Sequence, residues 1–371
     1  MYDILIVGGG LAGLINSILL SGAGLKVLLI EKKTYPFDKV CGEYISNEVV
    51  PFLHSINAFP SGLKPENIKR FQLSSVAGAS AILDLPQGGF GISRYSFDHF
   101  LFEKAQLAGA EFLLETIVQD IVYEEESFNV TCRDGKVIPA KIVIGSYGKR
   151  SGLDKILNRQ FFFKRSPYLG VKYHVRMDFP RDLVSLHNFK GGYCGLAAIE
   201  GGKTNLCYLS ETKNLKTYGN IKTMEEELLC KNPFLKETFS NCEFISEKPE
   251  VINEISFDPK STVEQHVLMS GDAAGLISPL CGNGMAMAIH SAKILSQLII
   301  RFYKTRNFNR EALEKAYTKE WSSYFAWRLW VGRNTQKLFG ASLSSTALVE
   351  ISKKYPLVTR WIIKQTHGRS F

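Results

Sequence analysis

The N-terminal stretch MYDILIVGGGLAGLINSILLSGAGLKVLLIEKK constrains the fold more than any other part of the chain. Residues 2–7 are apolar and β-branched, which predicts a strand buried on both of its faces. Gly8, Gly10 and Gly13 follow in a G-x-G-x-x-G pattern, and an apolar, helix-compatible run leads to a second predicted strand at 26–30. Strand, glycine turn, helix and strand in this order predict an α/β fold with a Rossmann-type parallel sheet.

The glycines and an acid at the end of the second strand suit a dinucleotide. Gly8 permits the tight turn, Gly10 lets the backbone approach a pyrophosphate, and Gly13 lets the helix pack against the strand. The helix N-terminus presents free N–H groups and a partial positive charge to phosphates. Glu31 lies 18 residues after Gly13 and is expected to accept a hydrogen bond from a ribose hydroxyl. An acid at this position favours FAD or NAD over NADP.

Composition narrows the class of protein. The length of 371 residues allows one large or two ordinary domains, and 45% hydrophobic residues is typical of a globular protein. No run of about 18 apolar residues occurs, so we expect no spanning helix. The chain enters its first strand at once, and we expect no signal peptide. Seven cysteines without C-x-x-C, and histidines without metal-ligand spacing, indicate free thiols in a reducing cytoplasm and no metal site.

The middle of the chain predicts two kinds of β-structure. A helix is expected at 96–108 from its amphipathic pattern. After it we expect strands at 111–114, 117–123, 127–132, 136–139 and 141–145, with a hairpin turn at Asp134-Gly135. Residues 161–260 hold strand-like runs separated by glycines and charged turns, which predicts an antiparallel sheet.

We therefore predict three regions. The nucleotide-binding domain is discontinuous and takes residues 1–160 and 262–305. A β-rich substrate domain, residues 161–261, is inserted into it. Residues 306–371 form a helical, basic C-terminal region.

A second motif, GDAAGLISPLCGNGMAMAI at 271–289, supports this division. Together with GGGLAG…IEKK and SRYSFDHFLFEKAQLAGAE, it resembles the FAD-dependent family of aromatic hydroxylases, flavin halogenases and geranylgeranyl reductases. The resemblance implies that Asp272 accepts from a ribityl hydroxyl and that Pro279 stiffens the loop. It also implies that Gly282 and Gly284 let backbone N–H groups lie against the flavin ring. The helix beginning near Gly284 would direct its positive end at the N1/O2 edge.

Further cofactor contacts follow from the same resemblance. Arg94 matches the family arginine that precedes F-D and touches the cofactor, and the Val118 backbone matches the position beside the adenine. Residues that flank the motifs are also expected to bind the cofactor: Leu11, Ala12, Lys32, Gly271, Asn283 and Met285.

Two departures from the family pattern affect the expected chemistry. Ser146-Tyr147-Gly148 stands where many relatives have A-D-G, so an acid is missing there. Gly275 replaces the histidine of the hydroxylase motif G-D-A-A-H, and with CGEYIS at 41–46 this favours the reductase and halogenase branches. The halogenase motif G-W-x-W-x-I-P and the reductase motif Y-x-W-x-F-P are both absent.

The leading hypothesis is an FAD oxidoreductase that reduces C=C bonds of an apolar isoprenoid, acyl or polyketide-like substrate, with NADH or NADPH as external donor. Cys41 and Cys281 are expected to flank the flavin, where a thiol either donates a proton or packs as a small hydrophobe. One alternative is a monooxygenase acting on an aromatic or polyketide substrate. Another is a non-catalytic FAD-holding scaffold or electron relay.

The C-terminal region is unusually basic. Residues 301–371 hold 14 Lys and Arg against 4 Asp and Glu, together with all four tryptophans. Tryptophan and basic residues suit a membrane interface, and the charge suits an acidic acyl carrier protein equally well. We expect a cytoplasmic protein, peripheral at the membrane if this surface docks there, with Lys353, Lys354 and Arg360 contributing charge. A solvated basic face is the simpler alternative. No feature indicates nucleic-acid binding.

Overall fold

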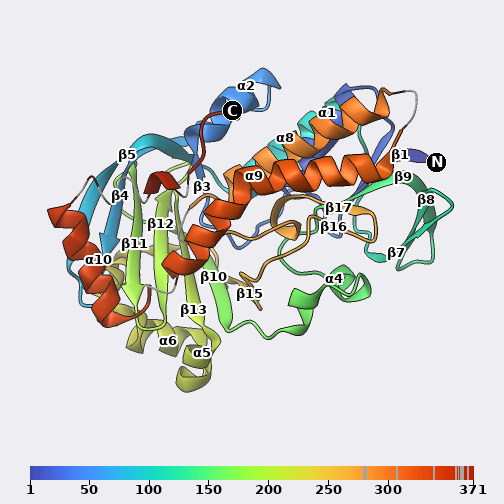
Figure 1. The fold of residues 1–371 in the computed structure, drawn as a ribbon. Helices are drawn as coiled ribbons and strands as arrows, with labels where there is room; N and C mark the ends of the chain where they lie inside the picture. The colour runs from blue at the N-terminus through green and yellow to red at the C-terminus, as the bar shows by residue number, and fades with distance from the viewer. Residues whose placement is uncertain are drawn as a thin grey trace.

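The computed structural model of the chain describes residues 1–278, 282–305, 308–336, 339–355, 357, 359, 363–365 and 367–371. Pro279, Cys281 and Arg360 lie outside these ranges, so their expected roles stay predictions. The described residues form two β-sheets with helices packed around them (Figure 1). The predicted α/β class, with a Rossmann-type sheet, a second β-rich layer and a helical C-terminal region, is confirmed.

The first sheet is parallel at its centre. Strand β1 (Tyr2–Val7) pairs in parallel with β2 (Val27–Ile30) on one side and with β9 (Val137–Gly145) on the other. β6 (Glu111–Leu113) extends the sheet beyond β2, and β17 (Val267–Met269) extends it beyond β9, both in parallel. All of β2 and the last four residues of β1 are buried, because helices or further strands cover both faces.

A meander continues this sheet. β7 (Val118–Glu124) and β8 (Ser127–Cys132) form a hairpin, and β8 pairs antiparallel with the first half of β9. The expectation of separate strands at 136–139 and 141–145 is wrong, because β9 runs unbroken through both. Its first half pairs with β8 and its second half with β1, so one strand serves two neighbours. The short β16 (Val263–Glu264) completes the edge beside β17.

Three helices cover one face of the first sheet. The central α1 (Leu11–Gly22) packs against both α3 (Arg94–Leu107) and α8 (Gly284–Tyr303), as Figure 1 shows for α1 and α8. Nearly every residue of α1 is buried. A helix that is apolar all round belongs inside a protein, which explains its position between the other two.

The second sheet has nine strands and lies on the left side of the molecule in Figure 1. In spatial order they are β14 (Glu243–Phe244), β10 (Tyr168–Arg176), β13 (Thr204–Glu211), β12 (Gly192–Ala198), β11 (Leu183–Phe189), β4 (Glu66–Ser74), β5 (Ser80–Gly91) and β3 (Tyr44–Ser46), with β15 (Glu250–Asn253) also on β10.

Strand membership corrects the sequence expectation in two ways. Residues 44–91, expected with the nucleotide-binding segment, supply β3, β4 and β5 to the second sheet. That sheet is also not purely antiparallel, because β4 pairs in parallel with β11. The chain leaves the first sheet after β2, crosses to the second, and returns through α3. The predicted limits of the three regions otherwise stay a prediction.

The C-terminal helices connect the layers. α9 (Arg310–Gln336) packs on α8, burying Trp321 and Phe325, and α10 (Ser342–Lys354) packs on β4 and β5. The remaining α-helices are short: α2 (Val50–Ser55), α4 (Gly152–Ile156), α5 (Thr212–Tyr218), α6 (Ile221–Glu227) and α7 (Pro233–Asn241). None of the helices in the described part of the chain has the length and apolar character that crossing a bilayer requires.

An acid lies buried between α6 and the second sheet. Oε1 of Glu225 accepts hydrogen bonds from the hydroxyls of Tyr208 (2.8 Å) and Tyr173 (3.0 Å). Burial outweighs these two bonds and raises the pKa of Glu225 from 4.5 to about 7. The folded protein therefore holds a proton there, between pH 4.5 and 7, that the unfolded chain releases. Stability decreases as the pH rises through this range.

We expect Glu225→Gln to remove this dependence. The variant should be up to about 3 kcal/mol more stable than the wild type at pH 8, and should show no gain at pH 4.5. Urea unfolding at both pH values measures this. The exposed neighbour change Glu226→Gln serves as the control. An equal stability change at both pH values would contradict the assignment.

Candidate FAD site

Close backbone packing shapes the turn after β1. Gly8 has φ +105°, and a Cβ there would lie 2.6 Å from the carbonyl oxygen of Ser146. A Cβ on Gly13 would lie 2.8 Å from the Ser146 hydroxyl. That hydroxyl donates to the Gly8 carbonyl at 2.6 Å. The serine that replaces the family's A-D-G pattern thus holds the glycine turn in place, and no side chain fits at either glycine.

The N-terminus of α1 is open and faces two cations. Its N-cap is Gly10, no side chain caps the helix, and no acid lies in its first turn. A Cβ on Gly10 would lie 3.3 Å from Lys39 Nζ and 3.6 Å from Arg94 Nη2. Unpaired helix N–H groups and two positive side chains around a bare glycine form a cradle for phosphates. The residues present therefore fit the pyrophosphate of FAD. Leu11 and Ala12 form the buried first turn beside it.

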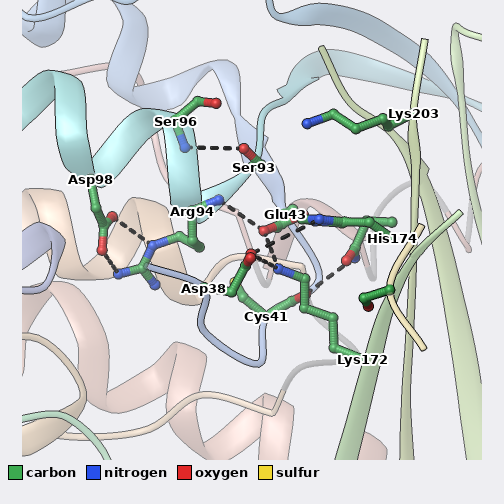
Figure 2. Close-up of polar contacts among 12 residues, drawn as sticks. Asp38, Cys41, Glu43, Ser93, Arg94, Ser96, Asp98, Lys172, His174 and Lys203 are labelled. Atoms are coloured by element: carbon green, nitrogen blue, oxygen red, sulfur yellow. Dashed lines mark hydrogen bonds and ion pairs between the residues drawn. The ribbon is translucent and has the colours of Figure 1, made fainter. Parts of the chain in front are cut away.

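A buried carboxylate holds the two cations. Asp98 on α3 accepts two hydrogen bonds from the Arg94 guanidinium, at 2.6 and 2.7 Å (Figure 2). It also pairs with Lys39 at 3.2 Å. Burial opposes ionisation of Asp98, but the two cations outweigh it and lower its pKa. Arg94 is thus placed beside the glycine turn, as its predicted cofactor contact requires. Lys39 and Asp98 were not predicted from the sequence as site residues, although Asp98 is the acid of the F-D pair.

The acid after β2 lies against the same turn. Glu31 is 7% exposed, and its carboxylate accepts from the backbone N–H of Gly9 at 2.7 Å and of Lys33 at 3.2 Å. These bonds place the carboxylate at the carboxyl end of the strand, where a ribose is expected. Lys32 is exposed beside it. Val118 is buried in the core at the start of β7, and its predicted backbone contact with adenine stays a prediction.

The motif that begins at Gly271 packs against the first turn of α1, which belongs to the N-terminal glycine motif. Gly271 begins the short 3₁₀ turn Gly271–Ala273 after β17 and has φ +67°. A Cβ there would lie 2.8 Å from Cβ of Ala12 on α1, and its N–H donates to Ser291 of α8 at 3.3 Å. The turn that presents Asp272 is therefore wedged between α1 and α8. Residues more than 250 positions apart in the chain thus line one site.

Asp272 is half-buried and surrounded by positive charge. Within the described chain its carboxylate has no hydrogen-bond partner, but Arg94, Lys149 and Lys260 lie close enough to interact with it electrostatically. Lys260 Nζ donates to the backbone carbonyls of Lys149 (2.7 Å) and Asp272 (2.8 Å), and burial lowers the pKa of Lys260 to about 8. Free acceptor oxygens suit the ribityl hydroxyl expected there.

The N-terminus of α8 faces the second sheet. Gly282 has φ +61°, and a Cβ there would lie 3.0 Å from the ring of Tyr44 on β3. Asn283, the N-cap, is buried, as is Met285, while Gly284 begins the helix with no acid in its first turn. The helix thus begins where the two sheets approach each other, consistent with a ring-binding role for its first turn.

The loop that bears Cys41 lies on the opposite side. Cys41 is half-buried, and its carbonyl accepts from Asn205 Nδ2 on β13 at 3.1 Å (Figure 2). Two residues later, Glu43 is fully buried and contacts Lys172 and His174 on β10. The sequence analysis did not assign these three residues. A lysine and a histidine two positions apart within the apolar strand YLGVKYHV were the available signal.

Comparison with known proteins agrees with this geometry. Residues 1–163 match the family described as "FAD binding domain". This match supports FAD as the cofactor that the N-terminal part of the chain binds. It is 27% identical to a digeranylgeranylglycerophospholipid reductase from Methanocaldococcus jannaschii, with 86% of this chain and 82% of that protein covered.

Two solved structures share the fold across almost the whole chain. A geranylgeranyl bacteriochlorophyll reductase-like protein from Thermoplasma acidophilum superposes with a TM-score of 0.79 at 19% identity, covering 98% of this chain and 99% of that one. A flavin-dependent brominase superposes with a TM-score of 0.81 at 17% identity, covering 100% and 94%. Reductase and halogenase therefore share this architecture, and the fold alone does not separate them.

We expect Asp272→Ala to weaken FAD retention without unfolding the protein. Loss of one buried charge-assisted hydrogen bond costs roughly 1.5–3 kcal/mol, which is a 10- to 150-fold rise in the dissociation constant. Fluorescence titration of the stripped protein with FAD measures it. Asp258→Ala, which removes a half-exposed acid that pairs only loosely with Lys164 at 3.8 Å, is the matched control. Equal FAD affinity in wild type and Asp272→Ala would contradict the assignment.

Proposed function

We propose that this protein reduces C=C bonds of an isoprenoid or similar apolar chain, with FAD as the bound cofactor and NADH or NADPH as the electron donor. The observation that supports this most directly is the likeness to a digeranylgeranylglycerophospholipid reductase over 86% of the chain. Gly275 in place of the hydroxylase histidine, and the C-G-E segment at 41–43, favour the reductase and halogenase branches over the hydroxylases.

Different residues of the chain would bind the cofactor, stabilise charge and hold a proton in such a reaction. Bound FAD in its reduced form would supply the hydride for one carbon of the double bond, and the protein would have to provide a proton for the other carbon. Arg94 and Lys39 would bind the pyrophosphate, and Asp272 would bind the ribityl chain. Together these contacts would fix the position of the cofactor in the site. The first turn of α8 would stabilise negative charge at the flavin edge. Cys41, on a loop fixed from the second sheet, is the group we assign to hold the proton.

Anaerobic half-reactions test the reaction class. The FAD-loaded protein is reduced with NADH, NADPH or dithionite, and an unsaturated isoprenoid lipid is then added without oxygen. Reoxidation of the flavin together with a product heavier by two hydrogens supports the proposal. Oxygen consumption with a hydroxylated or halogenated product would instead assign the protein to the other branches. No flavin reoxidation under either condition would indicate a non-catalytic FAD-holding protein.

Cys41→Ser should slow reoxidation by substrate while leaving FAD bound and the reduction rate unchanged. A serine hydroxyl is a far weaker acid than a thiol, so we expect a loss of about 10²-fold in the oxidative half-reaction. Stopped-flow absorbance resolves the two steps. Cys230→Ser, in a partly buried short helical turn after α6, is the control. Unchanged rates in Cys41→Ser would assign the thiol to packing.

We also propose that an exposed aromatic face on α9 docks on an anionic membrane, from which an apolar substrate is collected. This face comprises Tyr324, Trp327 and Trp330, which are 46%, 55% and 52% exposed. The two tryptophan rings stack at 5.0 Å between centroids. Trp321, one turn earlier in the helix, is buried at 6%, so α9 presents aromatic groups both inward and outward. Half-exposed indoles in a region of net charge +10 suit an anionic lipid interface.

The docking proposal predicts that Trp327→Ala/Trp330→Ala lowers co-sedimentation with vesicles of phosphatidylcholine and phosphatidylglycerol at least about tenfold, since buried indole area is lost. Binding should also weaken at high salt, and on neutralising Lys353 and Lys354. Phe163→Ala, which removes another exposed aromatic group, is the control. Binding to an acyl carrier protein but not to vesicles, or a change in oligomeric state alone, would contradict membrane docking.

A further inference from the structure

A buried ionic cluster joins the Cys41 loop to the second sheet (Figure 2). Lys172 and His174 are alternate residues of β10 and therefore point to the same side of the strand. Lys172 Nζ lies 2.6 Å from Glu43 Oε1 and 2.9 Å from Asp38 Oδ1. His174 Nε2 lies 2.6 Å from Glu43 Oε2. Both oxygens of one carboxylate on the loop are thus held by adjacent groups of one strand.

The positive charge in this cluster is the ammonium group of Lys172. Asp38, Glu43 and His174 bring ligand atoms within 4.8 Å of one another, which is compatible with metal binding. However, the Lys172 ammonium bonds to both carboxylates. Burial opposes its charge, yet Glu43 and Asp38 outweigh this effect and raise the pKa of Lys172. The lysine, only 2% exposed in its side chain, therefore occupies the place of a metal ion.

Glu43 also reaches the flavin side. Its Oε1 accepts from the backbone N–H of Arg94, at the first residue of α3, at 2.8 Å. The side chain of that arginine extends to Asp98 and to the cradle at Gly10. The Glu43 carboxylate therefore links the Cys41 loop to strand β10 and to Arg94, the residue expected to contact the cofactor pyrophosphate.

The backbone of Glu43 is strained, which explains why these contacts are needed. Glu43 has φ +55°, a left-handed conformation that is unfavourable for a non-glycine residue. Such a conformation persists only where surrounding contacts fix it. Its side-chain bonds to Arg94, Lys172 and His174 supply that fixation. Without them, the backbone is expected to relax to φ below zero and carry Cys41 with it.

We propose that Glu43, Lys172 and His174 form a latch that positions Cys41 at the flavin and couples the thiol's position to cofactor binding through Arg94. These three are positioning residues, since they act through Cys41 and Arg94 rather than on the substrate. The inference deepens the proposed function, because it concerns the thiol assigned there. The latch itself is a statement about loop geometry and can be tested without substrate.

The test measures alkylation of Cys41 by iodoacetamide in the FAD-loaded and FAD-stripped protein, with quantification by peptide mass spectrometry. In the wild type, FAD should slow alkylation of Cys41. In Lys172→Met, Cys41 of the loaded protein should be alkylated at least about tenfold faster, because charge-assisted bonds to the loop are lost. FAD should no longer protect the thiol in that variant.

Two histidine variants guard against simple misfolding. His174→Gln keeps an N–H donor near the Nε2 position and should retain most of the protection, whereas His174→Ala should lose it. Glu43→Gln combined with Lys172→Met should expose Cys41 no more than the more reactive single variant, because both changes break one contact.

Arg70→Met is the matched control. It breaks the half-exposed two-bond pair between Arg70 and Asp182 at the β4 side of the same sheet. Cys41 reactivity in this control should equal that of the wild type. The latch is refuted if Lys172→Met and His174→Ala fold normally and leave Cys41 alkylation unchanged, or if Arg70→Met accelerates it equally. If the protein reduces no C=C bond, the proposed function is refuted. The alkylation results would still decide whether the latch exists.

Discussion

The close approach of three chain segments at the first turn of α1 fixes the rest of the site. Gly8 lies against Ser146, Gly13 against the same serine, and Gly271 against Ala12. None of these contacts leaves room for a Cβ, so the segments after β1 and β9 meet backbone to backbone, and the turn after β17 packs directly on Ala12 of α1. This packing leaves the N-terminus of α1 open toward Gly10. The helix, strand or loop that carries each charged side chain then determines where that side chain lies around the opening.

A chain of buried charges transmits this geometry to the second sheet. Asp98 orients Arg94 and Lys39 toward the glycine turn, and the backbone of Arg94 meets Glu43. On the other side of the same helix end, Glu200 from the second sheet accepts from the Ser93 N–H at 2.8 Å and from the Ser96 hydroxyl at 2.8 Å. Two carboxylates from different segments therefore bind the N-terminus of α3, where the helix dipole favours negative charge. The N-terminus of α3 therefore connects the cofactor-binding layer to the second sheet.

The sequence predicted those parts of the site that backbone sterics dictate. Few other folds require glycines and acids at these spacings. The sequence therefore predicted the glycine turn, α1, Glu31 and the turn at Asp272. The latch could not be predicted, because Glu43 and Lys172 lie 129 positions apart and no local pattern pairs them. Membership of β3, β4 and β5 in the second sheet was missed for a related reason. Alternation of apolar and polar residues predicts a strand but not its neighbours, and here the sheet is completed by a parallel pairing of β4 with β11.

Residues 1–300 hold 31 Lys and Arg against 32 Asp and Glu, yet cations are in local excess at the site. Arg94, Lys39, Lys149 and Lys260 come from four segments and converge on the region between Gly10 and Asp272. Burial lowers the pKa of Lys39, Lys149 and Lys260, so each ammonium is less favourable in the cofactor-free fold than in water. A diphosphate placed at Gly10 would offset that cost for the cations nearest to it. Cofactor binding and folding are then linked through the same charges, because the group that the site recognises is also the group that compensates its half-buried lysines.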